Sequence, residues 1–144
     1  MKTIHTILLV AGASLISTAS LQADLLGDAL ALDAKKVCDV KTNGLEKVIA
    51  VAAKYNPEAV KLGIEFKRLG VTNSNYIKTT QAAIKAKEKN VVLKYNSKGK
   101  VKKHKMSTER AAWRACTFAL RALQDHAEAD KTWRLAVPGD GYKY

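Results

Sequence analysis

The segment from Ser107 to about Lys131 carries the longest uninterrupted apolar periodicity of the chain. At 100° per residue its apolar side chains form two adjoining arcs, so only a narrow strip of the predicted helix is polar. A helix that is apolar on most sides must be surrounded by other elements. We therefore expect it to be the central helix of a small helical domain, begun by a cap at Ser107 or Thr108. The side chains expected to face neighbours are Ala111, Ala112, Trp113, Ala115, Cys116, Phe118, Ala119, Leu120, Ala122, Leu123, Ala127 and Ala129.

The chain has two cysteines, Cys38 and Cys116, which stand 78 positions apart. In an exported protein an even pair most simply forms a disulfide, and two cysteines allow a single intramolecular connectivity. The chain-entropy model gives such a crosslink roughly 4 kcal/mol of stabilisation. A redox-active dithiol is disfavoured because the chain has no Cys-x-x-Cys pair.

Four further helices are expected before the central one. Helical spacing predicts them over 24–41, 45–55, 57–69 and 75–89. Asn43-Gly44 is expected to end the first of these helices, and Asn56-Pro57-Glu58 to stop the second and start the third. Gly70 should end the third.

Between the fourth helix and the central one, the sequence favours a β-hairpin over about 91–106. Val91 to Tyr95 suits an extended strand, Asn96 to Gly99 reads as a turn, and Lys100 to Met106 can return antiparallel. Lys100, Lys102 and His104 would share one face of this ribbon. Because lysines occur on both faces of the hairpin, we expect neither face to be deeply buried.

The N-terminal residues 1–23 are typical of a secretory signal peptide. Lys2 supplies the basic start, Ile7 to Ile16 the apolar core, and Ser17 to Ala23 the approach to cleavage. We expect the cut after Ala23, with Ala19 as an alternative. The apolar run is half the ~20 residues that a membrane-spanning helix needs. A single domain over 24–144, located in the periplasm or secreted, is the resulting expectation.

The positive charge of the chain is concentrated in one stretch. Of the net +12, residues 85–105 carry +8, from nine lysines and one glutamate. Such a concentration attracts an anionic partner without requiring shape complementarity. A purely structural interpretation is nearly as well supported as partner binding: lysines on an exposed strand edge prevent the edge from pairing with other chains. The binding candidates are Lys94, Lys98, Lys100, Lys102, Lys103 and Lys105.

Three kinds of partner fit this basic hairpin. An acidic protein or polysaccharide is the least demanding choice. Nucleic acid would use Tyr95 for stacking, but is not expected outside the cytoplasm unless the protein serves DNA uptake. An anionic membrane surface would find little apolar area to accompany the lysines.

A second hypothesis places function on the central helix. Arg114 and Arg121 lie seven residues apart on one helix face, and a groove there, with His126 nearby, could grip a carboxylate or phosphate. This would suit a periplasmic enzyme or a small-ligand carrier. Arginines so placed more often pair with acids on a neighbouring helix.

Known catalytic and metal-binding patterns are missing from the sequence. It has no His-Glu-x-x-His, no cysteine cluster, no phosphate-binding glycine loop and no Gly-x-Ser-x-Gly turn. His104 with Met106 is a weak candidate for a soft metal ion, but the lysines around it would repel a cation. The sequence thus predicts no catalytic residue, metal or cofactor, and leaves the oligomeric state open.

Taken together, these patterns predict a mainly α protein. We expect about five helices in a small bundle around a central C-terminal helix, one inserted lysine-rich β-hairpin and one disulfide. The leading functional expectation is an exported, non-enzymatic binding or accessory protein that docks on an anionic partner through the hairpin.

Overall fold

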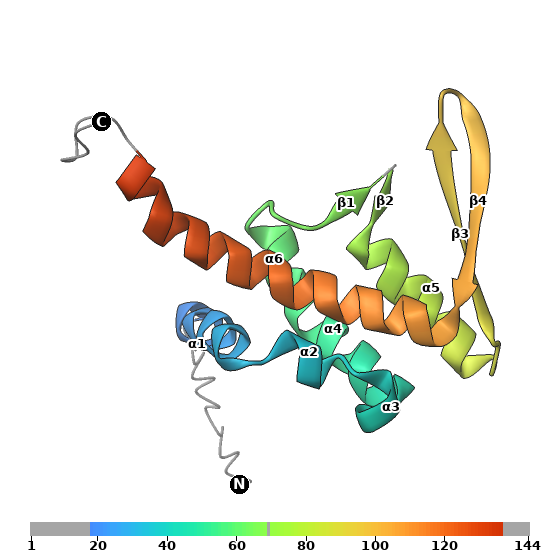
Figure 1. The fold of residues 1–144 in the computed structure, drawn as a ribbon, viewed down its shortest axis with the longest axis horizontal. Coiled ribbons are helices and arrows are strands. Elements are labelled where there is room, and N and C mark those ends of the chain that lie inside the picture. Colours follow the sequence, from blue (N-terminus) through green and yellow to red (C-terminus); the bar gives the residue numbers. More distant parts are fainter. Residues whose placement is uncertain (1–17, 69, 137–144) are drawn as a thin grey trace, which may run out of the picture.

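The computed structural model describes residues 18–68 and 70–136, arranged as helices with two small antiparallel hairpins (Figure 1). Most of the predicted signal peptide and the last eight residues lie outside this range. The elements in chain order are α1 (Thr18–Ala31), α2 (Ala34–Val37), α3 (Val40–Asn43), α4 (Leu45–Lys61), β1 (Lys67–Arg68), β2 (Val71–Thr72), α5 (Asn73–Lys85), β3 (Asn90–Ser97), β4 (Lys100–Ser107) and α6 (Thr108–Ala136).

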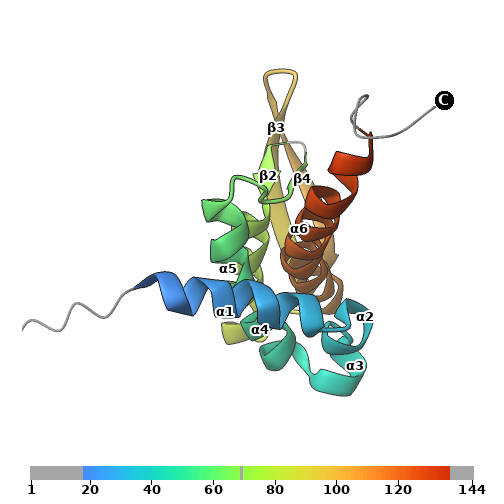
Figure 2. The same ribbon diagram turned by 90° about the vertical axis from the view of Figure 1, so that its left-hand side faces the viewer.

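The long helix α6 is the element on which the others pack. It contacts α1, α2, α3, α4, α5 and both strands of the β3–β4 hairpin, as Figures 1 and 2 show. Leu120 and Leu123, near its middle, are fully buried. The Ser107 hydroxyl accepts a hydrogen bond from the Arg110 amide at 3.2 Å, which is the cap expected at the start of this helix. The predicted helical fold around a central C-terminal helix is therefore confirmed.

The disulfide between Cys38 and Cys116 is present. Cys38 closes α2 and Cys116 lies in α6, with their Cα atoms 5.6 Å apart and both side chains fully buried. The crosslink thus ties the N-terminal segment to the central helix, as predicted.

The predicted helix over 24–41 is broken into three pieces. The carboxylate of Asp33 accepts hydrogen bonds from the Lys35 and Lys36 amides, at 2.9 and 3.3 Å, and that of Asp39 accepts one from the Lys41 amide at 3.0 Å. An aspartate that caps the following amides competes with helix continuation. These two caps restart the chain as α2 and α3 and turn its direction so that Cys38 reaches α6.

The sequence suggested that Pro57 stops a helix. In the structure α4 continues through Pro57 to Lys61. The helix ends at Lys61, and Gly63, two residues later, has a φ of +72°. The amide of Ile64 donates to the Ala59 carbonyl, and that of Gly63 donates to the Val60 carbonyl, which is the Schellman arrangement. The predicted third helix is therefore absent, and β1 and β2 form a short hairpin in its place.

Helix α5 begins at Asn73, two residues before the predicted start. The Thr72 hydroxyl accepts a hydrogen bond from the Asn75 amide at 3.3 Å and caps the helix. The helix ends at Lys85, so its last predicted turn is replaced by a turn into β3.

The predicted lysine-rich hairpin is formed by β3 and β4. Lys98 and Gly99, both with positive φ, make the two-residue turn, which is tighter than the predicted four-residue one. Val91, Leu93 and Met106 are buried at its base, so one face packs on the helices there, contrary to the expectation that neither face would be buried.

Within the described residues, no helix is long and apolar enough to cross a membrane.

Candidate functional site

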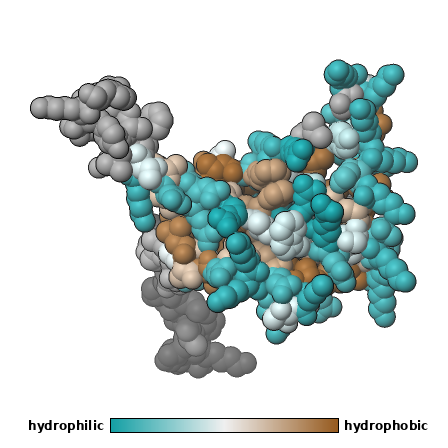
Figure 3. Space-filling view, in the orientation of Figure 1, coloured by the Kyte–Doolittle hydropathy of each residue, from teal (hydrophilic) through white to brown (hydrophobic). Residues whose placement is uncertain are grey.

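The β3–β4 hairpin extends beyond the helices and presents hydrophilic side chains at the edge of the molecule (Figures 1 and 3). Every one of the lysines singled out from the sequence is exposed. They are Lys94, Lys98, Lys100, Lys102, Lys103 and Lys105.

The charges of these lysines are not neutralised by nearby acids. The ion pairs found in 18–68 and 70–136 join Lys54 to Asp28, at 3.2 Å, and His126 to Asp130, at 3.8 Å. No acidic residue occurs between Asn90 and Ser107. The exposed lysines of the hairpin therefore keep their positive charge free to meet a partner.

The strand register divides the hairpin into two unlike faces. Leu93 is paired with His104, and Tyr95 with Lys102, so these four side chains share the face whose base is buried. We call this the inner face. The outer face is exposed along its whole length and carries Val92, Lys94, Val101, Lys103 and Lys105.

A cavity of about 250 Å³ lies where the inner face meets the helices. Basic and aromatic side chains from five elements and one buried valine line it, and no acidic residue does so. The lining consists of Arg68, Val71, Tyr76, Tyr95, His104 and Arg114.

Arg114 is held at this cavity by aromatic rings. Its guanidinium carbon lies 5.9 Å from the centre of the Tyr76 ring and 5.6 Å from that of Phe118. Phe118 in turn stacks on Phe66, with ring centres 3.7 Å apart. Contacts of this kind orient a cation without neutralising it.

None of the four cavities described for residues 18–68 and 70–136 brings Arg114, Arg121 and His126 together. Arg121 is exposed, and His126 pairs with Asp130 near the far end of α6. At 1.5 Å per residue, His126 lies roughly 18 Å from Arg114 along the helix axis. Of these three residues, Arg114 alone lines the cavity at the hairpin.

Besides the buried Val71, two residues of this cavity, Arg68 and Tyr76, were not indicated by the sequence as site residues. Arg68 belongs to β1, inside the segment predicted as the third helix, and Tyr76 lies near the start of α5. Nothing in their local pattern points to a site, because the β1–β2 turn and the start of α5 bring them together. Tyr95 and His104 were noticed only for stacking and for weak metal binding.

No cluster of three metal-binding side chains occurs in the described part of the chain. His104 lies instead beside two arginines at the cavity. These neighbours favour an anion over a metal cation.

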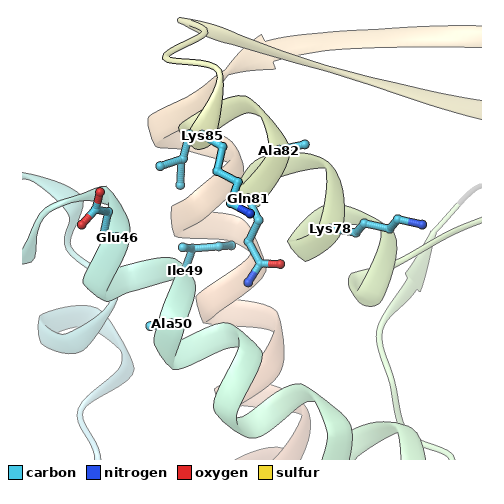
Figure 4. A pocket seen from close by; sticks show the side chains of 8 residues that line it. Glu46, Ile49, Ala50, Lys78, Gln81, Ala82 and Lys85 are labelled. Carbon is cyan, nitrogen blue, oxygen red and sulfur yellow. The ribbon is translucent and has the colours of Figure 1, made fainter.

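Three other cavities in the described part of the chain differ from this one in charge. The cavity between α4 and α5, shown in Figure 4, measures about 580 Å³ and combines apolar side chains such as Ile49 with both Glu46 and Lys85. A second cavity of about 580 Å³, at the end of α5, contains Glu88, Glu109 and lysines. A third, of about 260 Å³, places the exposed Trp113 among Asp39, Glu109 and basic residues. Of these cavities, only the one at the hairpin lacks an acidic residue.

The comparisons with known proteins give no match, whether to a family model, to a curated protein or to a solved structure.

Proposed function

We propose that the protein is an exported, non-enzymatic binding or accessory protein that docks on an anionic partner through the lysines of the β3–β4 hairpin. The observation that carries the proposal is the set of exposed, unneutralised lysines on a ribbon that extends from the helical body. An acidic polysaccharide or an acidic protein is the expected partner.

Export is supported by two features. Residues 1–23 have the charge and apolar pattern of a signal peptide. The Cys38–Cys116 crosslink suits an oxidising compartment such as the periplasm or the exterior of the cell.

Edge protection alone is a weaker explanation of the lysines. Edge protection requires charged side chains only along the strand edge that another chain could pair with. Here lysines occupy both faces and the turn, and Lys100 and Lys102 lie on the face that leads to the cavity.

Binding of the purified protein to immobilised polygalacturonate and to immobilised polyglutamate tests the proposal. The variant K98Q/K100Q/K102Q/K103Q should bind more weakly and depend less on salt, because fewer opposite charges are brought together. Its fold should be unchanged, since exposed lysines contribute little to stability.

The matched control removes four exposed lysines elsewhere, in K35Q/K36Q/K47Q/K61Q. Lys54 is left intact because it pairs with Asp28. Equal losses in the two variants would show that net charge alone matters, and unchanged binding in the hairpin variant would favour edge protection.

A small-ligand carrier is the second candidate, and the cavity beside Arg114 is the observation that favours it. Such a carrier would bind free galacturonate with an affinity that the four hairpin substitutions leave unchanged. A docking protein would bind the polymer much more tightly than the monomer, because several charges act together.

A further inference from the structure

The inner face of the hairpin and the cavity beneath it form one continuous basic track. His104, at the base of this face, lines the cavity, and Lys102 and Lys100 follow it along β4 toward the turn. Side chains two residues apart on a strand point the same way at intervals of about 6.8 Å. A linear anion lying along this face would meet these lysines in turn and end at the cavity.

The charges at the cavity select an anion. In the described part of the chain, no carboxylate lies within ion-pair distance of Arg68 or Arg114. The guanidinium group of an arginine matches a carboxylate with two parallel hydrogen bonds. Because Arg114 is already oriented by Tyr76 and Phe118, little of its freedom is lost on binding.

The size of the cavity and its aromatic side chains limit the kinds of anion that it can bind. A water molecule occupies about 30 Å³ of liquid, so about 250 Å³ admits a ring as well as its charged group. Tyr76 is 7% exposed, with Arg114 over its ring and Phe118 packed edge-on at 6.1 Å. The Tyr76 ring therefore offers no open platform for a nucleic acid base, so that stacking would depend on the half-buried Tyr95 ring alone.

We propose that this cavity binds one uronate residue of an acidic polysaccharide, with Arg68 and Arg114 holding the carboxylate and Lys102 and Lys100 holding the carboxylates of the following residues. The sugar hydroxyls would face Tyr95 and His104, whose polar atoms can exchange hydrogen bonds with them. This inference rests on the proposed docking function and specifies its partner and its orientation.

The first test compares two variants that lose the same number of charges from the same strand. K100Q/K102Q removes lysines from the inner face, and K103Q/K105Q removes lysines from the outer face. By titration calorimetry with an oligogalacturonate, the inner variant should bind about tenfold more weakly than the outer one, given the strength of a charged hydrogen bond. All four side chains are exposed, so both variants should keep the melting temperature of the native protein.

The second test addresses the cavity itself. Arg68→Gln should lower the affinity for the oligogalacturonate about tenfold or more, because the substitution removes a charged donor from the carboxylate. Arg110→Gln is the control, since Arg110 is exposed on α6 and lines a different cavity. Oligoglutamate and oligothymidylate of the same charge should bind more weakly, and with no dependence on Arg68.

The outcomes separate this inference from the function on which it rests. Equal losses in the two strand variants, with no effect of Arg68→Gln, would overturn the uronate site and leave docking through the hairpin intact. Oligothymidylate or oligoglutamate binding that falls as strongly with Arg68→Gln would overturn the choice of a uronate. Full binding by both strand variants would overturn the docking function as well.

Discussion

The side-chain amide of Asn73 donates a hydrogen bond to the backbone carbonyl of Ala115, 3.0 Å away in the middle of the bundle. The same Nδ2 atom donates to the Asn56 side-chain oxygen at 2.8 Å. Asn73 is fully buried and Asn56 is 3% exposed. One side chain at the start of α5 therefore joins α4 and α6.

Asn73→Ala should destabilise the protein by about 2–4 kcal/mol, because two buried acceptors lose their donor. Chemical denaturation measures this as a lower midpoint. Asn75→Ala is the matched control, since Asn75 lies in the same turn with its side chain exposed, and it should change the midpoint little. Equal midpoints for the two variants would show that the buried contacts of Asn73 contribute nothing.

Glu65 accepts a hydrogen bond from the Asn56 amide, and its carboxyl group makes the stability of this part of the fold depend on pH. Burial is the largest single effect and raises the pKa of this carboxyl, but hydrogen bonds from the Ser74 hydroxyl, the Asn56 amide and the Ser74 backbone, together with nearby Lys67, outweigh it. The pKa of Glu65 in the folded protein therefore lies below its ordinary value of 4.5.

Because the unfolded chain holds the proton of Glu65 more tightly, the contribution of this residue to stability is complete above the ordinary pKa and is lost as pH falls through the lowered one. Glu65→Gln should therefore flatten the decline in stability below about pH 5, measured by urea denaturation at a series of pH values. The pKa of Asp39 is also lowered, chiefly by the Thr42 hydroxyl, so some acid sensitivity should remain in the variant. An unchanged decline would exclude Glu65 as a source of it.

The elements that the sequence predicted well are those whose signals are local and repeated. The periodicity around Leu120 identifies α6, and alternation with a glycine turn identifies the β3–β4 hairpin. The disulfide follows from there being just two cysteines in a chain with a signal-like N-terminus. Each of these features needs no knowledge of distant residues.

The errors arose where a local signal competes with tertiary contacts. Pro57 is a general helix breaker, yet α4 continues through it while Asn56 beside it is held by Glu65 and Asn73. The spacing places Asp33 inside a single helix over 24–41, although its side chain caps the start of α2. Spacing alone does not show which of two competing hydrogen bonds forms.

The basic hairpin was visible as a charge run, but the cavity beside it was not. Arg68 and Arg114 are far apart in the sequence, and they meet because Gly63 ends α4 and the β1–β2 turn leads back past α6. The sequence did single out Arg114, but it paired this residue with Arg121 and His126 on its own helix rather than with the hairpin.

Removing the crosslink should weaken the fold without changing its shape. The C38S/C116S variant should lose about 4 kcal/mol of unfolding free energy, because 78 positions separate the joined residues and the unfolded chain regains freedom. Chemical denaturation with and without a reductant measures the loss. The reductant should lower the denaturation midpoint of the native protein and leave that of the variant unchanged. A lower midpoint in both proteins would mean that the reductant affects stability by a route other than the disulfide.

The last prediction separates two apolar residues of α6 that the sequence placed together in the core. Leu123 is fully buried, whereas Trp113 is 45% exposed, contrary to the expectation for it. Trp113 lies about two turns before Arg121, which is also exposed, so both are on a side of the helix that solvent reaches.

Leu123→Ala should cost about 2–5 kcal/mol, because it leaves a cavity among α6 and its neighbours. Trp113→Ala should cost less than this, although tryptophan is the larger side chain, because much of its surface already contacts water. Denaturation midpoints rank the two variants, and Leu120→Ala, also fully buried, should match Leu123→Ala. If Trp113→Ala lowers the unfolding free energy more than either leucine variant does, the exposed fraction of Trp113 is a poor measure of its contribution to stability.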